Sequence, residues 1–379
     1  MNRAHFGGLL LIVLWSSVAT PALGQPVTCF ATPTGTTSGT CSTWATACTL
    51  SHVLDSTVNC DQVLVKQGTY GPIALRDNVK VFGGFAGTES SPSASNPTAY
   101  PTIVDGGGSA RAVTSTGNGS ATWLWGFTIR NGSDTGYDGG GGVAMFDSNA
   151  MFVRCVFENN NATWWGGAAS ATGNGSPDFV NCIFRDNGSS STIAGGALHI
   201  KSAGSPRFTN CLFHDNEANE GGAAAVLTGT PKFVNCTFSK NSASIKSGGA
   251  VHDHEGTAEF TNSLLWDNEG AEGADEAYND PIRRSAMSYT DVKGGWAGST
   301  NLNADPLFVS SSSDDYTIPS NSPCVSKGKN TLVTLDIADL DWDGNTTEMV
   351  PFDLGGNPRK RGVIVDMGAY EAPLSGGSQ

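Results

Sequence analysis

The sequence predicts an all-β protein: a right-handed parallel β-helix with three strands per coil, a period of about 27 residues and capped ends. Three observations support this fold. The 379 residues include 49 glycines, and only 15% of them are charged, which is typical of turn-rich β structure. One motif recurs five times between Gly139 and Asn268. Within the copies, apolar and polar residues alternate, which indicates short strands with one buried face.

The first 24 residues have the features of a secretory signal peptide. Arg3 precedes an apolar run over residues 9–15, and small residues before Gln25 form a cleavage pattern. A buried N-terminal helix is the alternative, which the polar stretch that follows disfavours. The run is too short to span a bilayer, and no later stretch reaches the roughly 18 apolar residues that a span requires. We therefore expect export by the Sec pathway, to the medium or to the cell surface or outer membrane, without a transmembrane span.

The mature chain divides into three parts. We expect a disulfide-linked cap with a short helix over 25–67, the β-helix over 68–318, and a C-terminal capping region with an acidic loop over 319–379. Caps are needed because an open β-helix exposes unpaired strand edges. Near-helical apolar spacing places the short helix over residues 44–54. Four cysteines surround this helix and predict two disulfides in any of three pairings, since their spacing lacks the close pairs of a zinc site: Cys29, Cys41, Cys48 and Cys60.

Each repeat combines a Gly-Gly pair with the pattern Phe-x-Asn-Cys-x-Phe-x-x-Asn. Because identical residues one coil apart stack in columns, four columns follow. The predicted corner column, with positive φ, contains Asn181, Asn210, Asn235 and Asn262. A second asparagine column of the same kind contains Asn160, Asn187, Asn216, Asn241 and Asn268. The core columns contain Phe184, Phe213 and Phe238, and the buried cysteines Cys155, Cys182, Cys211 and Cys236. We expect these cysteines to be free thiols, with a bridge between coils as the alternative, and Cys324 to pack in the C-terminal region.

Side chains that follow each Gly-Gly pair alternate between the core and the outside. If Val143 aligns with Ala168, the outward columns contain Met145, Ser170, His199, Ala225 and His252, then Asp147, Thr172, Lys201, Leu227 and His254. The weak catalytic candidates are Asp147, Lys201, His199, His252 and His254. Apolar residues interrupt this row, and Asp147 and Lys201 would lie roughly 10 Å apart, two coils of about 4.8 Å. Trp164 and Trp165, before the next Gly-Gly pair, could stack on a sugar ring or simply cover the adjacent coil.

The C-terminal region contains an acidic loop with the ligand spacing of a calcium loop. Asp339, Asp341, Asp343 and Asn345 supply oxygens, and Gly344 allows the sharp bend. The match to an EF-hand is incomplete, because Val350 stands where the bidentate acid would be and Glu348 comes two residues early. Two further aspartates could supply oxygens, namely Asp336 and Asp353. The sequence leaves two interpretations open here, a site that binds Ca²⁺ and a plain acidic surface turn.

The repeats resemble those of polymorphic outer-membrane proteins and, more broadly, of the pectin-lyase-like β-helix superfamily. The resemblance rests on the Gly-Gly-Ala segments, as at 195–197, and on the Phe-x-x-Asn segments, as at 213–216. The flanking segments 81–89, 294–298, 305–308 and 366–371 are similar to those of secreted bacterial β-helix proteins whose C-termini are called choice-of-anchor domains. This resemblance implies the fold and export, and it assigns no activity.

The chain has a formal net charge of −14, which disfavours nucleic acid and anionic lipid as partners. We expect a monomeric, adhesin-like binding or structural module whose partner is a polysaccharide or another cell-envelope component. The alternative is an enzyme, either a polysaccharide lyase or a glycoside hydrolase, which would need clustered carboxylates beside a base. The interrupted outward row favours the binding module.

Overall fold

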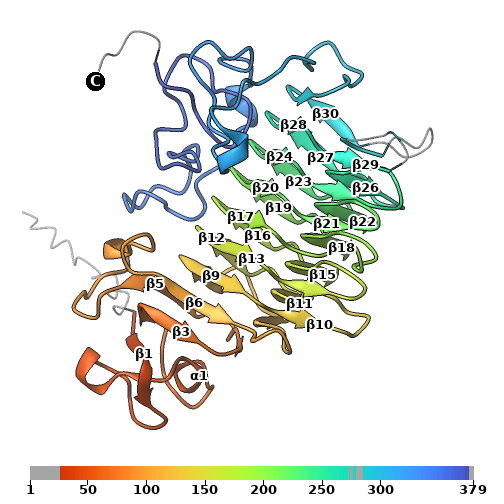
Figure 1. Cartoon of the computed structure of the whole chain (residues 1–379). Helices are drawn as coiled ribbons and strands as arrows, with labels where there is room; N and C mark the ends of the chain where they lie inside the picture. The colour runs from red at the N-terminus through yellow and green to blue at the C-terminus, as the bar shows by residue number, and fades with distance from the viewer. Residues whose placement is uncertain (1–25, 272, 274–275, 279–284, 375–379) are drawn as a thin grey trace, which may run out of the picture.

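The computed structural model describes residues 26–374, except 272, 274, 275 and 279–284. Strands pair in parallel and stack in three main sheets around one core, which confirms the predicted parallel β-helix (Figure 1). Among these residues, no helix is long and apolar enough to cross a membrane. The segment predicted as a signal peptide, 1–24, lies outside the described part of the chain.

The main sheets contain ten, nine and seven strands. The ten-stranded sheet has the order β1 (Thr28–Thr36), β2 (Gln62–Lys66), β5 (Lys80–Phe85), β8 (Trp123–Trp125), β12 (Met151–Val153), β16 (Asp178–Val180), β19 (Arg207–Thr209), β23 (Lys232–Val234), β27 (Glu259–Thr261) and β30 (Ala286–Ser288). The nine-stranded sheet has the order β3 (Gly68–Tyr70), β6 (Thr102–Asp105), β9 (Phe127–Arg130), β13 (Val156–Glu158), β17 (Ile183–Arg185), β20 (Leu212–His214), β24 (Thr237–Ser239), β28 (Leu264–Trp266) and β31 (Asp291–Val292).

The seven-stranded sheet has the order β26 (Val251–Asp253), β22 (Ala224–Thr228), β18 (Leu198–Ser202), β15 (Ala169–Gly173), β11 (Val143–Phe146), β7 (Val113–Thr116) and β4 (Ile73–Ala74). Seven coils therefore contribute to all three sheets. Short strands at one corner form two minor sheets: β10 (Ser133–Asp134) with β14 (Asn161–Ala162), and β21 (Glu217–Ala218), β25 (Ser242–Ala243) and β29 (Glu269–Gly270). Single 3-10 turns occupy Pro92–Ala94, Ser311–Ser313 and Asn330–Leu332.

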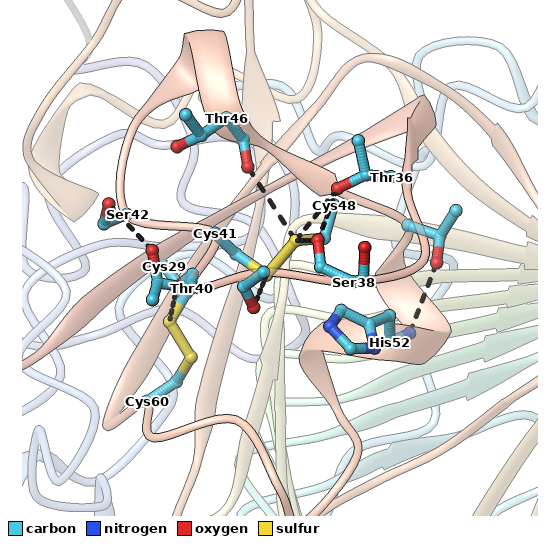
Figure 2. Close-up of a disulfide and its surroundings, with 12 residues drawn as sticks. Cys29, Thr36, Ser38, Thr40, Cys41, Ser42, Thr46, Cys48, His52 and Cys60 are labelled. Carbon is cyan, nitrogen blue, oxygen red and sulfur yellow. Dashed lines mark hydrogen bonds between the residues drawn. A yellow bond between two sulfur atoms is a disulfide. The ribbon is translucent and has the colours of Figure 1, made fainter.

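The N-terminal end is covered by a small disulfide-linked unit. The predicted helix is split into a 3-10 turn at Trp44–Thr46 and the helix α1 at Leu50–Val53, whose Leu50 and Val53 are buried in the core. Disulfides join Cys29 to Cys60 and Cys41 to Cys48 (Figure 2). The prediction of two disulfides is confirmed, and the fold selects one of the three pairings left open.

Two columns of stacked phenylalanine rings fill the core. In one, ring centroids lie 4.6 Å apart between Phe184 and Phe213 and 4.4 Å apart between Phe213 and Phe238. The other contains Phe152, Phe179, Phe208, Phe233 and Phe260, with spacings of 4.8 to 4.9 Å. The predicted stacking is confirmed, and each ring also makes edge contacts with the other column.

A ladder of buried asparagine amides runs beside the phenylalanine core. Asn187 Nδ2 donates to Asn216 Oδ1 at 3.0 Å and to a backbone carbonyl of the preceding coil. The same pattern repeats over Asn160, Asn187, Asn216, Asn241 and Asn268. This column does not have the positive φ that was predicted for it. Positive φ falls on the residue before each asparagine, so that the amide points inward: Asn159, Asp186, Asp215, Lys240 and Asp267.

The other asparagine column does occupy a positive-φ corner, with φ of 51 to 53°. Asn210 Nδ2 donates to Asn181 Oδ1 at 3.0 Å, and Asn262 Nδ2 lies 3.5 Å from Asn235 Oδ1. The column also holds the C-terminal segment, because its amides donate to carbonyl oxygens far along the chain, such as that of Asp353.

Residues 329–372 were expected to belong to a cap over the C-terminal end, but they run along the side of the β-helix instead. Figure 1 shows this segment in blue beside the strands. It contacts coils from Phe82 to Asn262. Arg359 is only 1% exposed and donates to Glu371 within the segment and to Asn210 of the corner column. The bond to Asn210 attaches the segment to that column.

The repeated cysteines are free and buried, as expected. Each of Cys155, Cys182, Cys211 and Cys236 lies within hydrogen-bonding distance of a backbone carbonyl of the preceding coil. Burial raises the pKa of the Cys155, Cys182 and Cys211 thiols. These groups therefore serve packing. Cys324 is also buried, and its Sγ lies 3.0 Å from Asp291 Oδ2.

Replacing Phe213 by Ala should lower the free energy of unfolding by about 3–5 kcal/mol, because rings in both neighbouring coils lose contacts. Chemical denaturation of the variant and the wild type measures this difference. Ile245→Ala, at a side chain that is 59% exposed, is the matched control and should change little. Equal losses in the two variants would contradict the stacked core.

The asparagine ladder ends on Glu276, whose Oε2 accepts from Asn268 Nδ2 at 2.5 Å. Burial raises the pKa of Glu276 from 4.5 to about 8, so the unfolded chain loses its proton first and stability falls as pH rises across this interval. In Glu276→Gln this fall should be shallower, because an amide supplies an acceptor without titrating. Unfolding midpoints measured across the interval test this, with the exposed Glu269→Gln as control. Parallel curves for Glu276→Gln and wild type would refute it.

Candidate functional site

The outward face of the seven-stranded sheet carries most of the predicted site residues, although the predicted register is wrong in its first coil. Val143 pairs with Ala169, not with Ala168. Because residues 139–142 are four consecutive glycines, this repeat can be aligned with the Gly166-Gly167 repeat in two ways. In the structure Gly140 takes the place of Gly166, and both have positive φ. The outward column is therefore Ala144, Ser170, His199, Ala225 and His252.

This shift moves two predicted residues off the outward row. Met145 points into the core and is 3% exposed. Asp147 follows the strand at φ 49°, and its Oδ1 accepts from the backbone N–H of Asn174 at 2.7 Å. Asp147 thus holds a turn, and Phe146 takes the outward place before it. A β-bulge after Ile200 pairs Lys201 with Thr228, so Leu227 is not its direct partner.

A groove of about 300 Å³ lies on this face. Its floor comes from β11, β15, β18 and β22, and one wall comes from the corner loop before β11. The lining residues are Tyr137, Asp138, Phe146, Trp165, Thr172, Gly173, His199, Lys201 and Leu227. Tyr137 is 72% exposed and Phe146 54% exposed, so aromatic surface is open to solvent here.

The two predicted tryptophans take different roles at the groove. Trp165 lines it and stacks on His199, with centroids 5.0 Å apart and planes at 20°. Trp164 instead packs on Tyr137 at 4.5 Å. Each of these two ring pairs joins neighbouring coils. Sequence reasoning missed Tyr137, because the loop before β11 has no counterpart pattern in the other repeats, and it missed Phe146, because the predicted register of β11 was wrong.

His199 is held in its neutral form beneath Trp165. Ser170 Oγ donates to the carbonyl of Asp138 at 2.7 Å and lies 3.2 Å from His199 Nδ1, so the Nδ1–H must be the donor to Ser170. His199 Nε2 is buried without a partner among the described residues. Burial lowers the pKa of His199 from 6.5 to about 3, with Lys201 and His254 contributing. A histidine with this pKa is a weak base at neutral pH.

Lys201 is the exposed cation of the groove. Within the described residues, no carboxylate forms an ion pair with it. His252 and His254 lie further along the same face, two coils away.

These two histidines form a separate polar cluster with Glu220, a residue that the sequence did not point to. His254 Nε2 lies 3.2 Å from one oxygen of Glu220, and Lys246 Nζ lies 2.6 Å from the other. These hydrogen bonds lower the pKa of Glu220 to about 2. His252 stacks on Tyr278. Although Glu220, His252 and His254 are close enough to hold a metal ion, both oxygens of Glu220 are already engaged.

A larger cleft, of about 710 Å³, lies where the C-terminal segment meets the β-helix. Its lining includes the loop around Pro97, Arg154, Asn181 and the turn at Gly355. Most of this lining is backbone and small side chains, and its aromatic member, Phe127, is 1% exposed. It therefore lacks the open aromatic surface of the groove on the seven-stranded sheet.

The predicted metal ligands lie in the loop of the C-terminal segment. Carboxylate oxygens of Asp339, Asp341 and Asp343 lie within 4.8 Å of one another. The Asn345 side chain lies beside this group: its Oδ1 accepts from Thr347, and its Nδ2 donates to Glu348 Oε2 at 3.4 Å. Asp353 is also absent from the group, because its oxygens accept from Asn357 and Glu371. A second triad shares Asp341 and adds Asp336 and Glu348.

The neutral state of His199 makes stability pH-dependent. Below pH 6.5 the unfolded chain binds a proton on this histidine, whereas the folded chain takes it up only near pH 3. The free energy of unfolding should therefore decrease as the pH is lowered from 6.5 to 3. In His199→Gln this fall should be shallower, as measured by unfolding midpoints. The control is His52→Gln, in the N-terminal cap. An NMR titration that places the His199 pKa near 6.5 would contradict the prediction.

Comparisons with known proteins address the fold. Residues 112–280 match the family model described as "Right handed beta helix region". No curated protein matches the sequence. A solved structure titled "Crystal structure of pectate lyase Pel9A" is similar, with a TM-score of 0.40, 13% identity, and coverage of 91% of this chain and 96% of that chain, values too low to support any statement on activity. With its three main sheets of parallel strands, the chain folds as a right-handed parallel β-helix.

Proposed function

We propose that the protein is exported and binds a neutral polysaccharide in the groove on the seven-stranded sheet. The observation that carries this proposal is the open aromatic surface of the groove, where Tyr137 and Phe146 are more than half exposed. Contiguous exposed apolar surface rimmed by polar groups is typical of binding sites. An extended sugar chain suits this groove because its floor crosses four neighbouring strands, β11, β15, β18 and β22, which are spaced about 4.8 Å apart.

Aromatic rings offer a sugar an apolar face to stack on, and the polar residues around them can bind its hydroxyl groups. Trp165 is held by its stack on His199, and Tyr137 by its contact with Trp164. Because these rings are already packed, little side-chain freedom is lost when a ligand binds. Thr172, Lys201 and Asp138 supply hydrogen-bonding groups beside them.

The charges favour a neutral ligand. The groove contains one cation, Lys201, and one acid, Asp138, while the whole chain carries −14. Such a field repels polyuronides. Two of the catalytic candidates also favour binding over catalysis, because Asp147 is engaged in a turn and His199 stays neutral.

The expected signal peptide supports export, and so do the two disulfides, which persist in oxidising compartments. A monomer at the cell surface or in the medium would then display the groove to a polysaccharide of the envelope or surroundings.

Replacing Trp165 or Tyr137 by Ala should weaken binding of a neutral polysaccharide about 2- to 10-fold, from the loss of an aromatic contact of roughly 0.5–1.5 kcal/mol. Affinity electrophoresis in gels containing xylan, a β-glucan or a galactan measures this, with polygalacturonate as the charged comparison. The control is Tyr100→Ala, at a residue outside the groove. Equal retardation of all variants, or binding to polygalacturonate alone, would refute the proposal.

The enzyme alternative has its own readout in the same experiment. Reducing-end and unsaturated-product assays on these polysaccharides should remain at background. Product release that disappears in Lys201→Ala would establish a lyase or hydrolase in place of a binding module.

A further inference from the structure

The loop from Asp336 to Glu348 gathers four carboxylates around that of Asp341. Oxygens of Asp339, Asp341 and Asp343 form one group within 4.8 Å, and oxygens of Asp336, Asp341 and Glu348 form another. Oxygens that bind one Ca²⁺ at 2.3–2.6 Å must lie within about 5 Å of one another. Both groups meet this condition, and they share a residue.

An independent observation on the buried side of the loop also points to a ligand. Asp336 is 0% exposed, and its Oδ1 has no hydrogen-bond partner among the described residues. Glu348 is partly exposed, but its Oε1 is shielded from solvent and also has no hydrogen-bond partner among the described residues. A buried carboxylate oxygen without a donor is strongly unfavourable, and both residues belong to the group that meets at Asp341.

From this geometry we propose that the loop binds one Ca²⁺, with Asp341 at the centre, Asp336 and Glu348 on the buried side, and Asp339 and Asp343 on the solvent side. The ion supplies the missing partner of both buried oxygens. Protein cations do not fill this role. Lys80 interacts electrostatically with Asp339, and Arg154 with Asp336, but neither forms an ion pair with the loop within the described residues.

The backbone of the loop leaves oxygens for the ion. Asp336 Oδ2 accepts from Leu340 N at 2.8 Å, and Asp339 Oδ1 accepts from Gly344 N at 3.1 Å. Each carboxylate therefore keeps its orientation through one oxygen and presents the other. Several flexible carboxylates suit the 6–8 oxygen ligands of Ca²⁺ better than the strict octahedron of Mg²⁺.

The position of the loop indicates what the ion does. Trp342, between the ligands, packs on Trp125 at 5.2 Å and on Phe82 at 5.8 Å, both from the ten-stranded sheet. Leu340 and Val350 are buried in the same cluster. Asp336 N donates to the carbonyl of Glu348 at 2.9 Å, which closes the base of the loop. By joining carboxylates from both ends of the loop, Ca²⁺ fastens the C-terminal segment to the side of the β-helix.

Calorimetric titration of CaCl₂ into chelator-treated mature protein should give one site, and the melting temperature should rise as free Ca²⁺ exceeds the dissociation constant. Tryptophan emission should change with the same midpoint, because Trp342 lies inside the loop. Asp336→Asn and Glu348→Gln should each weaken binding at least about tenfold, the loss expected when a ligand carboxylate is removed. The matched control, Glu255→Gln, at an exposed acid on the seven-stranded-sheet face, should bind as wild type does.

Absence of binding heat and of a melting shift up to millimolar CaCl₂ would overturn the proposal. Undiminished affinity in both Asp336→Asn and Glu348→Gln would overturn it as well, since the ion would then be held elsewhere. Circular dichroism checks that the variants fold. If the Asp336→Asn variant does not fold, Asp343→Asn, at an exposed residue, replaces it and should also weaken Ca²⁺ binding. Equal affinity for MgCl₂ would refute the assignment to calcium.

Discussion

Each coil of this protein depends on the next to satisfy the amides that it buries. The inward asparagines bond mainly to the neighbouring coils: Nδ2 of Asn187, for example, donates to Oδ1 of Asn216 in the next coil and to a carbonyl of the preceding one. A buried amide without partners would cost roughly 1–3 kcal/mol, which makes the stacking register strict. The flanking phenylalanine columns are therefore held in contact, with spacings of 4.4 to 4.9 Å.

That strict register turns the outside of the β-helix into a regular surface on which side chains from different coils meet. The strands contribute Phe146, His199, Lys201 and Leu227 to this surface. The groove arises because the corner segments before β11 and β15 add Tyr137 and Trp165 beside them. The resulting surface combines exposed rings with few charges, a combination that suits recognition of a sugar better than proton transfer.

The corner asparagines have a second role that explains the path of the C-terminal segment. Corner positions have positive φ and expose an amide at the side of each coil. Carbonyls of the C-terminal segment accept from these amides over several coils, and Arg359 donates to one of them. The segment is thus attached along a line, and its acidic loop comes to rest against Trp125 and Phe82.

The sequence alone predicted the fold, the core columns, the free cysteines and the presence of two disulfides, because each depends on residues that repeat every coil or that pair locally. It could not predict the register at the four glycines 139–142, because two alignments have the same spacing and only the backbone conformation of Gly140 separates them. The helix at 44–54 was predicted in one piece and is broken in two, since disulfides and the first coil constrain it. The groove, the cluster at Glu220 and the joining of Asp336 to Asp341 depend on contacts between segments without a shared pattern. Only the tertiary structure could decide them.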